Sequence, residues 1–386
     1  MLYIDQLETV LMAAFLNGVT TELVSEPGIG KSSVIRQTAK KMAARLNAPF
    51  CLVVRHLSTM DPTDVAGPLF ISRRKIVANG EELEMESAMN SYPALFPNSK
   101  DKVFLPDGSE TTVERHGSVP KFGFVFLDEL RQAPHDVQKP AARFMDEQCI
   151  GDWSLDMFGG KWGVVAASNR AEDRSGANKD LAFITNRKMI LNVRSSVQIL
   201  CNYFEATGMH HLAIGYVRAF PGSVFTPEVP KDDKPFPTPR SFERCSKLLM
   251  TLGNGEKLAT NEEAVEVACG LIGEGKGPEY IGYLRLAEHM VTIDEIIADP
   301  AKARIPDRAD VMWAVTQMMV HHADKDNAIK LFRYVMRIPR EMQLVAIASI
   351  SSKVKQLQYN AEYSKWAAEN RDLLLAAYAA DRRLSK

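Results

Sequence analysis

Ser25-Glu-Pro-Gly-Ile-Gly-Lys-Ser32 is a glycine-rich stretch with the layout G-x-x-x-x-G-K-[ST], except that Ser25 stands in place of the first glycine. Gly28 and Gly30 allow successive backbone N–H groups to point at phosphate oxygens, in conformations that a side chain would resist. Lys31 would place its charge on the β and γ phosphates, and Ser32 would offer its hydroxyl to Mg²⁺. The expected nucleotide-binding residues are Glu26, Pro27, Gly28, Ile29, Gly30, Lys31, Ser32 and Ser33.

The segments on both sides of this stretch predict a βαβ unit. Glu22-Leu-Val-Ser25 predicts a short strand before the glycines, and the stretch from Ser32 to Leu46, rich in Ala, Lys, Arg and Met, predicts a helix after them. Phe50-Cys-Leu-Val-Val-Arg55 predicts a second, buried strand. A strand, a helix and a strand in this order indicate a parallel sheet.

A second motif is an apolar strand that ends in two carboxylates, Phe122-Gly-Phe-Val-Phe-Leu-Asp-Glu129. The continuous apolar run predicts a central strand that is buried on both faces. Because parallel sheets bind ligands at the carboxyl ends of their strands, we expect Asp128 beside the glycine-rich loop. Asp128 would hold Mg²⁺ through water, and Glu129 would orient or deprotonate an attacking water.

Three further polar side chains are candidates for catalysis. Trp162-Gly-Val-Val-Ala-Ala-Ser-Asn169 predicts a third buried strand, and Asn169 at its tip could hydrogen-bond the γ-phosphate or its attacking water. Arg187 lies just before a strand predicted over residues 188–193, and Arg240 lies where a proline predicts the start of a helix. A guanidinium is suited to spreading the charge of a transferring phosphoryl group.

The rest of the chain divides into an irregular segment and a helical half. Residues 71–121 hold Gly, Asn, Ser, Pro and mixed charges with little periodicity, which predicts an insertion of short hairpins or loops rather than core. After residue 195 the strand patterns end, prolines cluster between Pro221 and Pro239, and helical periodicity dominates from Ser241 onward.

The composition of the 386 residues is that of an ordinary globular protein of two or three domains. A formal net charge of −1 gives no overall attraction to nucleic acid or to an anionic membrane. No run approaches the roughly 20 apolar residues of a membrane span, and the N-terminus lacks the basic leader of a secretion signal. Five widely spaced cysteines without a CxxC pair favour reduced thiols, so we expect a cytoplasmic location.

Two histidine pairs, His210-His211 and His321-His322, raise the question of a bound metal. Adjacent side chains on a helix diverge by about 100°, and no third ligand is evident in the sequence. We therefore interpret these four residues as surface or core histidines.

Taken together and in this order, the motifs resemble those of an AAA+ ATPase, and more closely a MoxR-like ATPase, over roughly residues 5 to 250. The likeness rests on the glycine-rich loop, Leu57-Ser-Thr-Met-Asp-Pro-Thr-Asp-Val-Ala-Gly67, Leu127-Asp-Glu-Leu-Arg-Gln-Ala-Pro134, Ala167-Ser-Asn169 and Thr238-Pro-Arg240. The sequence departs from the family pattern in three ways: Ser25 replaces a glycine, Arg131-Gln132 stands where Asn-Arg is common, and Lys188 stands where an aromatic residue is usual.

The resemblance implies an α/β fold, the P-loop NTPase αβα sandwich with a parallel sheet that forms the AAA+ core. This core would cover residues 1–195, with the insertion at about 71–121. A linker and helical lid would follow over 196–300, and a C-terminal helical region over 301–386. By position, the resemblance assigns Lys31 and Ser32 to Walker A, Asp128 and Glu129 to Walker B, Asn169 to sensor 1, Arg240 to sensor 2, and Arg187 to the arginine finger of a neighbouring subunit.

The resemblance also implies an ATP hydrolase that uses ATP and Mg²⁺, assembles with copies of itself as a ring, most often a hexamer, and remodels a protein client as a chaperone does. Two alternatives stay open. One is a nucleic-acid motor or loader, for which Arg73-Arg-Lys75 could meet phosphates. The other is a nucleotide-gated scaffold that binds ATP with little turnover. The sequence specifies neither the client nor an adaptor.

Overall fold

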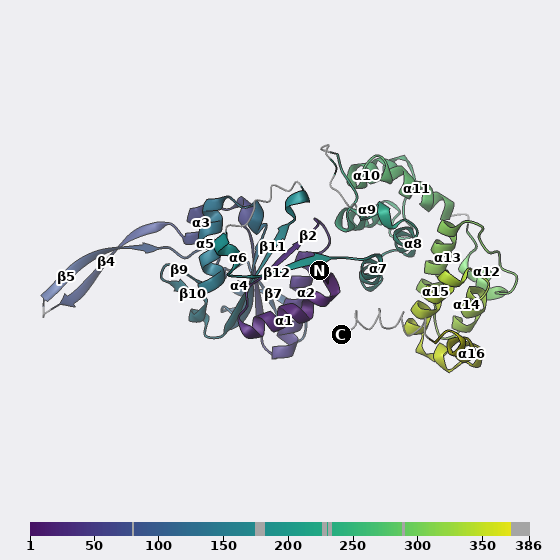
Figure 1. Ribbon diagram of the computed structural model, residues 1–386, viewed down its shortest axis with the longest axis horizontal. Coiled ribbons are helices and arrows are strands. Elements are labelled where there is room, and N and C mark those ends of the chain that lie inside the picture. Colours follow the sequence, from purple (N-terminus) through teal and green to yellow (C-terminus); the bar gives the residue numbers. More distant parts are fainter. Residues whose placement is uncertain (79–80, 174–181, 226–229, 231–233, 288–289, 372–386) are drawn as a thin grey trace. The chain divides into compact units, whose positions relative to one another are not determined.

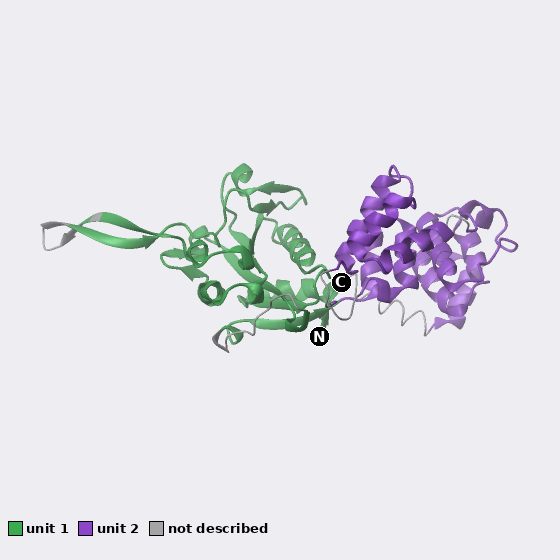
Figure 2. Cartoon of the chain, turned by 90° about the horizontal axis from the view of Figure 1, so that it is seen from above, with its two compact units in different colours: residues 1–194 green, residues 195–386 purple. Residues whose placement is uncertain are grey.

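The computed structural model describes residues 1–78, 81–173, 182–225, 230, 234–287 and 290–371. The chain divides into two compact units, Met1–Arg194 and Ser195–Lys386, which Figure 2 shows in green and purple. Unit 1 combines helices and strands, whereas the described part of unit 2 contains helices and no strand (Figure 1). The boundary near residue 300, between a helical lid and a C-terminal helical region, stays a prediction.

An eight-stranded sheet forms the centre of unit 1. In order across the sheet its strands are β1 (Leu2–Tyr3), β12 (Met189–Arg194), β2 (Thr21–Ser25), β11 (Lys161–Asn169), β8 (Phe122–Asp128), β3 (Phe50–His56), β6 (Lys102–Phe104) and β7 (Glu110–Thr112). The first six strands pair in parallel, and β6 and β7 extend the sheet with antiparallel pairs. The predicted parallel sheet is confirmed, and the strand before the glycine-rich loop is internal to it.

Helices cover both faces of this sheet. The helices of unit 1 are α1 (Leu7–Asn17), α2 (Lys31–Leu46), α3 (Pro62–Ala66), α4 (Val113–His116), α5 (His135–Glu147) and α6 (Ala182–Thr185). On one face Phe15 of α1 packs on Phe124 of β8, with ring centroids 5.4 Å apart. Because successive strand residues point to opposite faces, the next residue, Val125, belongs to the core cluster that includes Phe144 of α5. The layers are therefore helix, sheet and helix, as predicted.

The segment 71–121 differs in part from the expectation of peripheral hairpins and loops. Its first part lies in the long antiparallel hairpin of β4 (Leu69–Ala78) and β5 (Glu81–Asn90), which extends away from the sheet (Figure 1). Its second part belongs to the core, because Phe96, Val103 and Phe104 are fully buried. The prediction is wrong for this second part, since its apolar runs are too short to show a period.

Unit 2 is built from the helices that follow β12. They are α7 (Val197–Ala206), α8 (His211–Ala219), α9 (Pro239–Leu252), α10 (Glu262–Ile272), α11 (Lys276–Ala287), α12 (Ile293–Ala298), α13 (Ala309–His322), α14 (Ala328–Val335), α15 (Arg340–Lys353) and α16 (Ala361–Glu369). Helices α7 to α11 share one apolar cluster and α12 to α16 share another. Helix α13 joins the two, because its Ala314 lies in the first cluster and its Met319 in the second. Among the described helices, none combines the length and apolar character that a membrane crossing requires.

Candidate phosphate-binding site

The glycine-rich loop connects the end of β2 to the start of α2. β2 is buried along its whole length, and α2 begins at Lys31. Gly28 and Gly30 have φ angles of +75° and +104°, in the left-handed region where a side chain is strained. Both glycines therefore adopt backbone conformations that a side chain would resist, as the sequence predicts. The N-terminus of the long helix α2 adds the positive end of its dipole at this place.

Lys31 is held inside the loop. Its Nζ donates hydrogen bonds to Ser25 Oγ at 2.7 Å and to Asn169 Oδ1 at 3.1 Å. The side chain of Lys31 is buried, and the carbonyl oxygens of Ser25 and Glu26 are further acceptors. This geometry explains the departure at Ser25, whose hydroxyl accepts a hydrogen bond that a glycine could not. It also joins the loop to the tip of β11, the strand between β2 and β8.

Ser32 and Asp128 face each other at the same edge of the sheet. Ser32 Oγ lies 3.5 Å from Asp128 Oδ2. Burial raises the pKa of the Asp128 carboxyl, and the charge of Glu129 raises it further, although His56 opposes them with its Nδ1 at 3.7 Å from Asp128 Oδ2. A hydroxyl and a carboxylate are hard oxygen ligands of the kind that Mg²⁺ prefers. The residues present therefore fit a magnesium ion, whose charge would favour the ionised carboxylate.

The carboxylate of Glu129 is oriented by two local features. Its backbone has a φ of +61°, and its N–H donates to Asp128 Oδ1 at 3.0 Å. Ser58, in the short 3₁₀ turn after β3, donates its hydroxyl proton to Glu129 Oε2. A left-handed conformation is costly for a residue with a side chain, so the surroundings hold this turn in place.

A buried ionic cluster surrounds Glu22 of β2, the strand that leads into the glycine-rich loop. Glu22 of β2 is fully buried, and Arg131 donates two hydrogen bonds to its carboxylate, at 2.7 and 2.8 Å. Lys188 Nζ lies 2.9 Å from the same carboxylate, and Ser168 Oγ donates to it at 2.7 Å. Burial by itself raises the pKa of Glu22, but Arg131, Lys188 and Ser168 outweigh it, and the net pKa is lowered.

Two of the residues that depart from the pattern of the resembled family, Arg131 and Lys188, belong to this cluster. Arg131 and Lys188 both pair with Glu22, so each change of residue type is matched by the acidic side chain in β2. The cluster connects β2 to the segment after β8 and to the start of β12.

The two candidate arginines belong to different units, Arg187 to unit 1 and Arg240 to unit 2. Arg187 precedes β12 and lies 3.4 Å from Asp146 Oδ2. Because Met189 pairs in parallel with Thr21 at the start of β2, Arg187 is at the opposite end of the sheet from the loop of its own chain. Arg240 is exposed in the first turn of α9, whose predicted start is confirmed by Thr238 as the capping residue. The roles of both arginines stay predictions.

Sequence reasoning missed three residues near the loop. Ser58 and His56 follow from the pairing of β3 with β8, because strands that are neighbours bring the residues after them together. Arg170 comes directly after Asn169, and its guanidinium is paired with Glu26 of the loop at 3.2 Å and with Asp173 at 2.7 Å. The order of strands in the sheet would have been needed to find them.

Comparison with known proteins finds remote structural matches, of which two are described here. Neither a protein-family model nor a curated protein sequence matches the chain. The crystal structure of NtrX from Brucella abortus in complex with ADP aligns with a TM-score of 0.38 and 15% identity, covering 92% of this chain and 67% of that one. A candidate ATPase from Cytophaga hutchinsonii aligns with a TM-score of 0.29 and 14% identity, covering 97% and 89%. Both scores are low, and the fold assignment rests on the strand order and loop described above.

Proposed function

We propose that this chain, whose unit 1 has the αβα fold of an AAA+ P-loop NTPase core, binds Mg²⁺–ATP and hydrolyses it. The single observation that carries the proposal is the convergence of Lys31, Ser32, Asp128 and Asn169 at one edge of the sheet. These four side chains come from three separate segments of the chain. Their chemistry, one cation with a hydroxyl, a carboxylate and an amide, matches what a bound triphosphate requires.

Each side chain has a distinct role in this proposal. Ser32 and Asp128 would hold Mg²⁺, which supplies charge neutralisation on the phosphates when bound. Lys31 would exchange its present partners, Ser25 and Asn169, for phosphate oxygens. The amide of Asn169 would then be available to position water, and Glu129 would accept the proton of that water at its carboxylate. Catalysis would consist of positioning and charge stabilisation, because phosphoryl transfer needs little covalent work from the protein.

We further propose that activity requires assembly of several copies of the chain in a ring. Arg187 lies at the opposite end of the sheet from its own loop, so it could serve only the site of a neighbouring copy. This placement supports the role of an arginine supplied in trans. As in the MoxR-like ATPases that the sequence resembles, the ring would act on a protein client. The exposed hairpin of β4 and β5, with Ile71 70% exposed, offers surface for such contacts.

The alternative of a nucleic-acid motor gains no support from the hairpin. Arg73, in the basic stretch of β4, is paired with Glu86 of β5 at 2.7 Å. A basic side chain that is already paired with a carboxylate offers less charge to phosphates. The scaffold alternative differs only in turnover, so hydrolysis measured on the purified protein separates it from our proposal.

The first test is nucleotide binding by isothermal titration calorimetry together with phosphate release. We expect Lys31→Ala to weaken Mg²⁺–ATP binding by about 10- to 100-fold, because it removes charge-assisted hydrogen bonds to phosphate. Lys40→Ala is the matched control, since Lys40 lies exposed on the same helix, and it should bind as the unaltered chain does. No heat with Mg²⁺–ATP from the unaltered chain would refute the proposal.

A further inference from the structure

The helical unit brings together histidines that lie far apart in the sequence. His211 is the first residue of α8, and His321 and His322 are the last two residues of α13. One ring nitrogen of each of these three histidines lies within 4.8 Å of those of the other two. The ring of His211 is 5.5 Å from that of His321 and 6.0 Å from that of His322. The third possible ligand that was not evident in the sequence is His211, which α8 brings beside the pair on α13.

The packing of α8 against α13 places these side chains. The two helices run antiparallel, so the start of α8 meets the end of α13, and one turn further Gly215 meets Ala314. A Cβ on Gly215 would lie 3.1 Å from the Cα of Ala314 and 2.6 Å from the hydroxyl oxygen of Tyr283. Only a glycine permits this close approach, which keeps the two helix ends within reach of each other.

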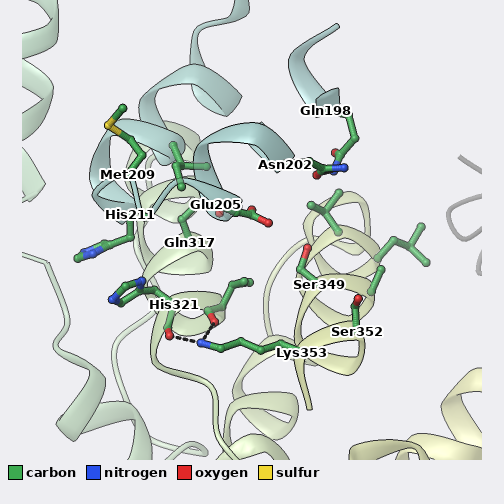
Figure 3. A pocket seen from close by; sticks show the side chains of 16 residues that line it. Gln198, Asn202, Glu205, Met209, His211, Gln317, His321, Ser349, Ser352 and Lys353 are labelled. Atoms are coloured by element: carbon green, nitrogen blue, oxygen red, sulfur yellow. Dashed lines mark hydrogen bonds between the residues drawn. The ribbon is translucent and has the colours of Figure 1, made fainter. Parts of the chain in front are cut away.

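The surroundings leave room for a ligand beside the three rings. His211 and His321 lie side by side at one end of a cavity of about 490 Å³ (Figure 3). A second cavity of about 340 Å³ is lined by both histidine pairs. Lys353, the nearby cation, donates hydrogen bonds to the carbonyl oxygens of Val320 and His321 (Figure 3). Its ammonium therefore caps the end of α13 and is directed at backbone oxygens.

The imidazoles are suited to coordination. His210 accepts a hydrogen bond at Nδ1 from the backbone N–H of Leu212, and its ring stacks on that of His211 at 4.3 Å. This contact supports the orientation of the His211 ring. His211 is half-buried, and its ring also stacks against that of His321 on α13. A neutral imidazole has the free lone pair that a metal ion needs.

We propose that His211, His321 and His322 form a binding site for a divalent transition-metal ion of the zinc class, which ties the start of α8 to the end of α13. Three imidazole ligands suit Zn²⁺, and this set leaves a fourth position for water or another small ligand. Zn–N distances are about 2.0–2.1 Å, so the nitrogen atoms need to approach one another by rotation of the side chains. The two exposed histidines at the helix end have the freedom to do so.

The test is zinc binding to the full chain without a polyhistidine tag, after removal of metals with a chelator and in the absence of nucleotide. Isothermal titration calorimetry should show one Zn²⁺ per chain, and Co²⁺ in its place should give the absorption bands of a tetrahedral site. We expect His211→Ala and His322→Ala each to weaken Zn²⁺ binding by at least about 10-fold, since each removes one of three ligands. His116→Ala is the matched control, because His116 is exposed in unit 1, and it should bind Zn²⁺ unchanged.

Thermal unfolding supplies a second measurement. Zn²⁺ should raise the Tm of the unaltered chain and of His116→Ala, but not that of His322→Ala, because only a bound ligand stabilises the folded state. His322 is exposed, so its replacement keeps the test valid if His211→Ala fails to fold. Absence of zinc binding by the unaltered chain, or undiminished binding by a folded variant of either residue, overturns the proposal. The three proposed ligands all belong to unit 2 and the titration is done without nucleotide, so its outcome does not depend on whether the loop of unit 1 binds ATP.

Discussion

The two units differ in the charge of the polar side chains that they bury. In unit 1 a fully buried carboxylate, Glu22, is matched by Arg131 and Lys188, and the ionised form is the favoured one. In unit 2 most of the buried polar side chains that the structure describes are uncharged, as in the contact between the buried Ser246 hydroxyl and Tyr280, and the buried cation there is Arg218, which pairs with Glu205 at 3.1 Å. His211 belongs to the same pattern, because burial keeps its ring uncharged.

This difference has a functional meaning. A site for a triphosphate needs charges that are already in place before the ligand arrives, since they act without reorganisation. In unit 1, Lys31 is held by Ser25 and Asn169 at the ends of β2 and β11, and Asp128 ends the next strand, β8, so these groups suit the site that we propose. The metal site that we propose in unit 2 would need neutral imidazoles, and most of the buried polar side chains described in that unit are uncharged. We therefore expect substitutions that change charge to have large effects in unit 1 and small ones in unit 2.

The largest expected effect is on ATP turnover, when the charge of Arg187, at the opposite end of the sheet from the loop, is removed. Arg187→Ala should lower ATP turnover by about 10³-fold or more if Arg187 acts in a neighbouring site. Glu129→Gln should bind ATP and lose turnover as well. Mixing the two variants should restore part of the activity, because some interfaces then combine an intact base with an intact arginine. Phosphate release measured across mixing ratios checks this, and an absence of rescue at every ratio would rule out Arg187 in trans.

The next effect concerns the buried cluster beneath the loop. Glu22→Gln should lower the free energy of unfolding of unit 1 at pH 7 by about 3 kcal/mol, because it leaves two cations without their carboxylate. The folded pKa of Glu22 lies below its ordinary value of 4.5, so its contribution is present above that pH and is lost as the pH falls further. The free energy of unfolding of the variant should therefore fall less steeply than that of the unaltered chain as the pH drops below 4.5.

Denaturant unfolding at several pH values measures this second effect. Glu147→Gln is the matched control, since Glu147 forms an exposed pair with Arg143 at 2.8 Å. An exposed pair is screened by water, so no measurable change is expected there. Equal stability of Glu22→Gln and the unaltered chain at pH 7 would contradict the role given to the cluster.

The smallest effect is expected in unit 2. Without metal, His322→Ala should change the free energy of unfolding by less than about 0.5 kcal/mol, because the side chain is exposed and makes no buried ion pair. Denaturant unfolding in the presence of a chelator measures it. A loss comparable to that of Glu22→Gln would show that His322 supports the packing of α13 directly, and the contrast between the two units would then be weaker than we describe.

The sequence predicted most of the parallel sheet and the main residues of the loop site. Glycines at positions 28 and 30, and a strand that ends in Asp128 and Glu129, leave a local pattern that can be recognised without any contact map. The hydrogen bond of Ser58 to Glu129 left no such pattern, because it depends on β3 and β8 being neighbours. The same holds for the buried strand β6, whose three residues are too few to display a period.

By itself the sequence determined the features that depend on neighbouring residues: strands from apolar runs, left-handed turns from glycines, and the order of helix and strand that makes a parallel sheet. Only the tertiary structure decided which distant side chains meet. Arg131 reaches Glu22 across 109 residues, and His211 reaches His321 through the packing of two helices. The physical reason is that backbone preferences are local, whereas the pairing of charges and rings depends on strand order and helix packing, which are properties of the whole fold.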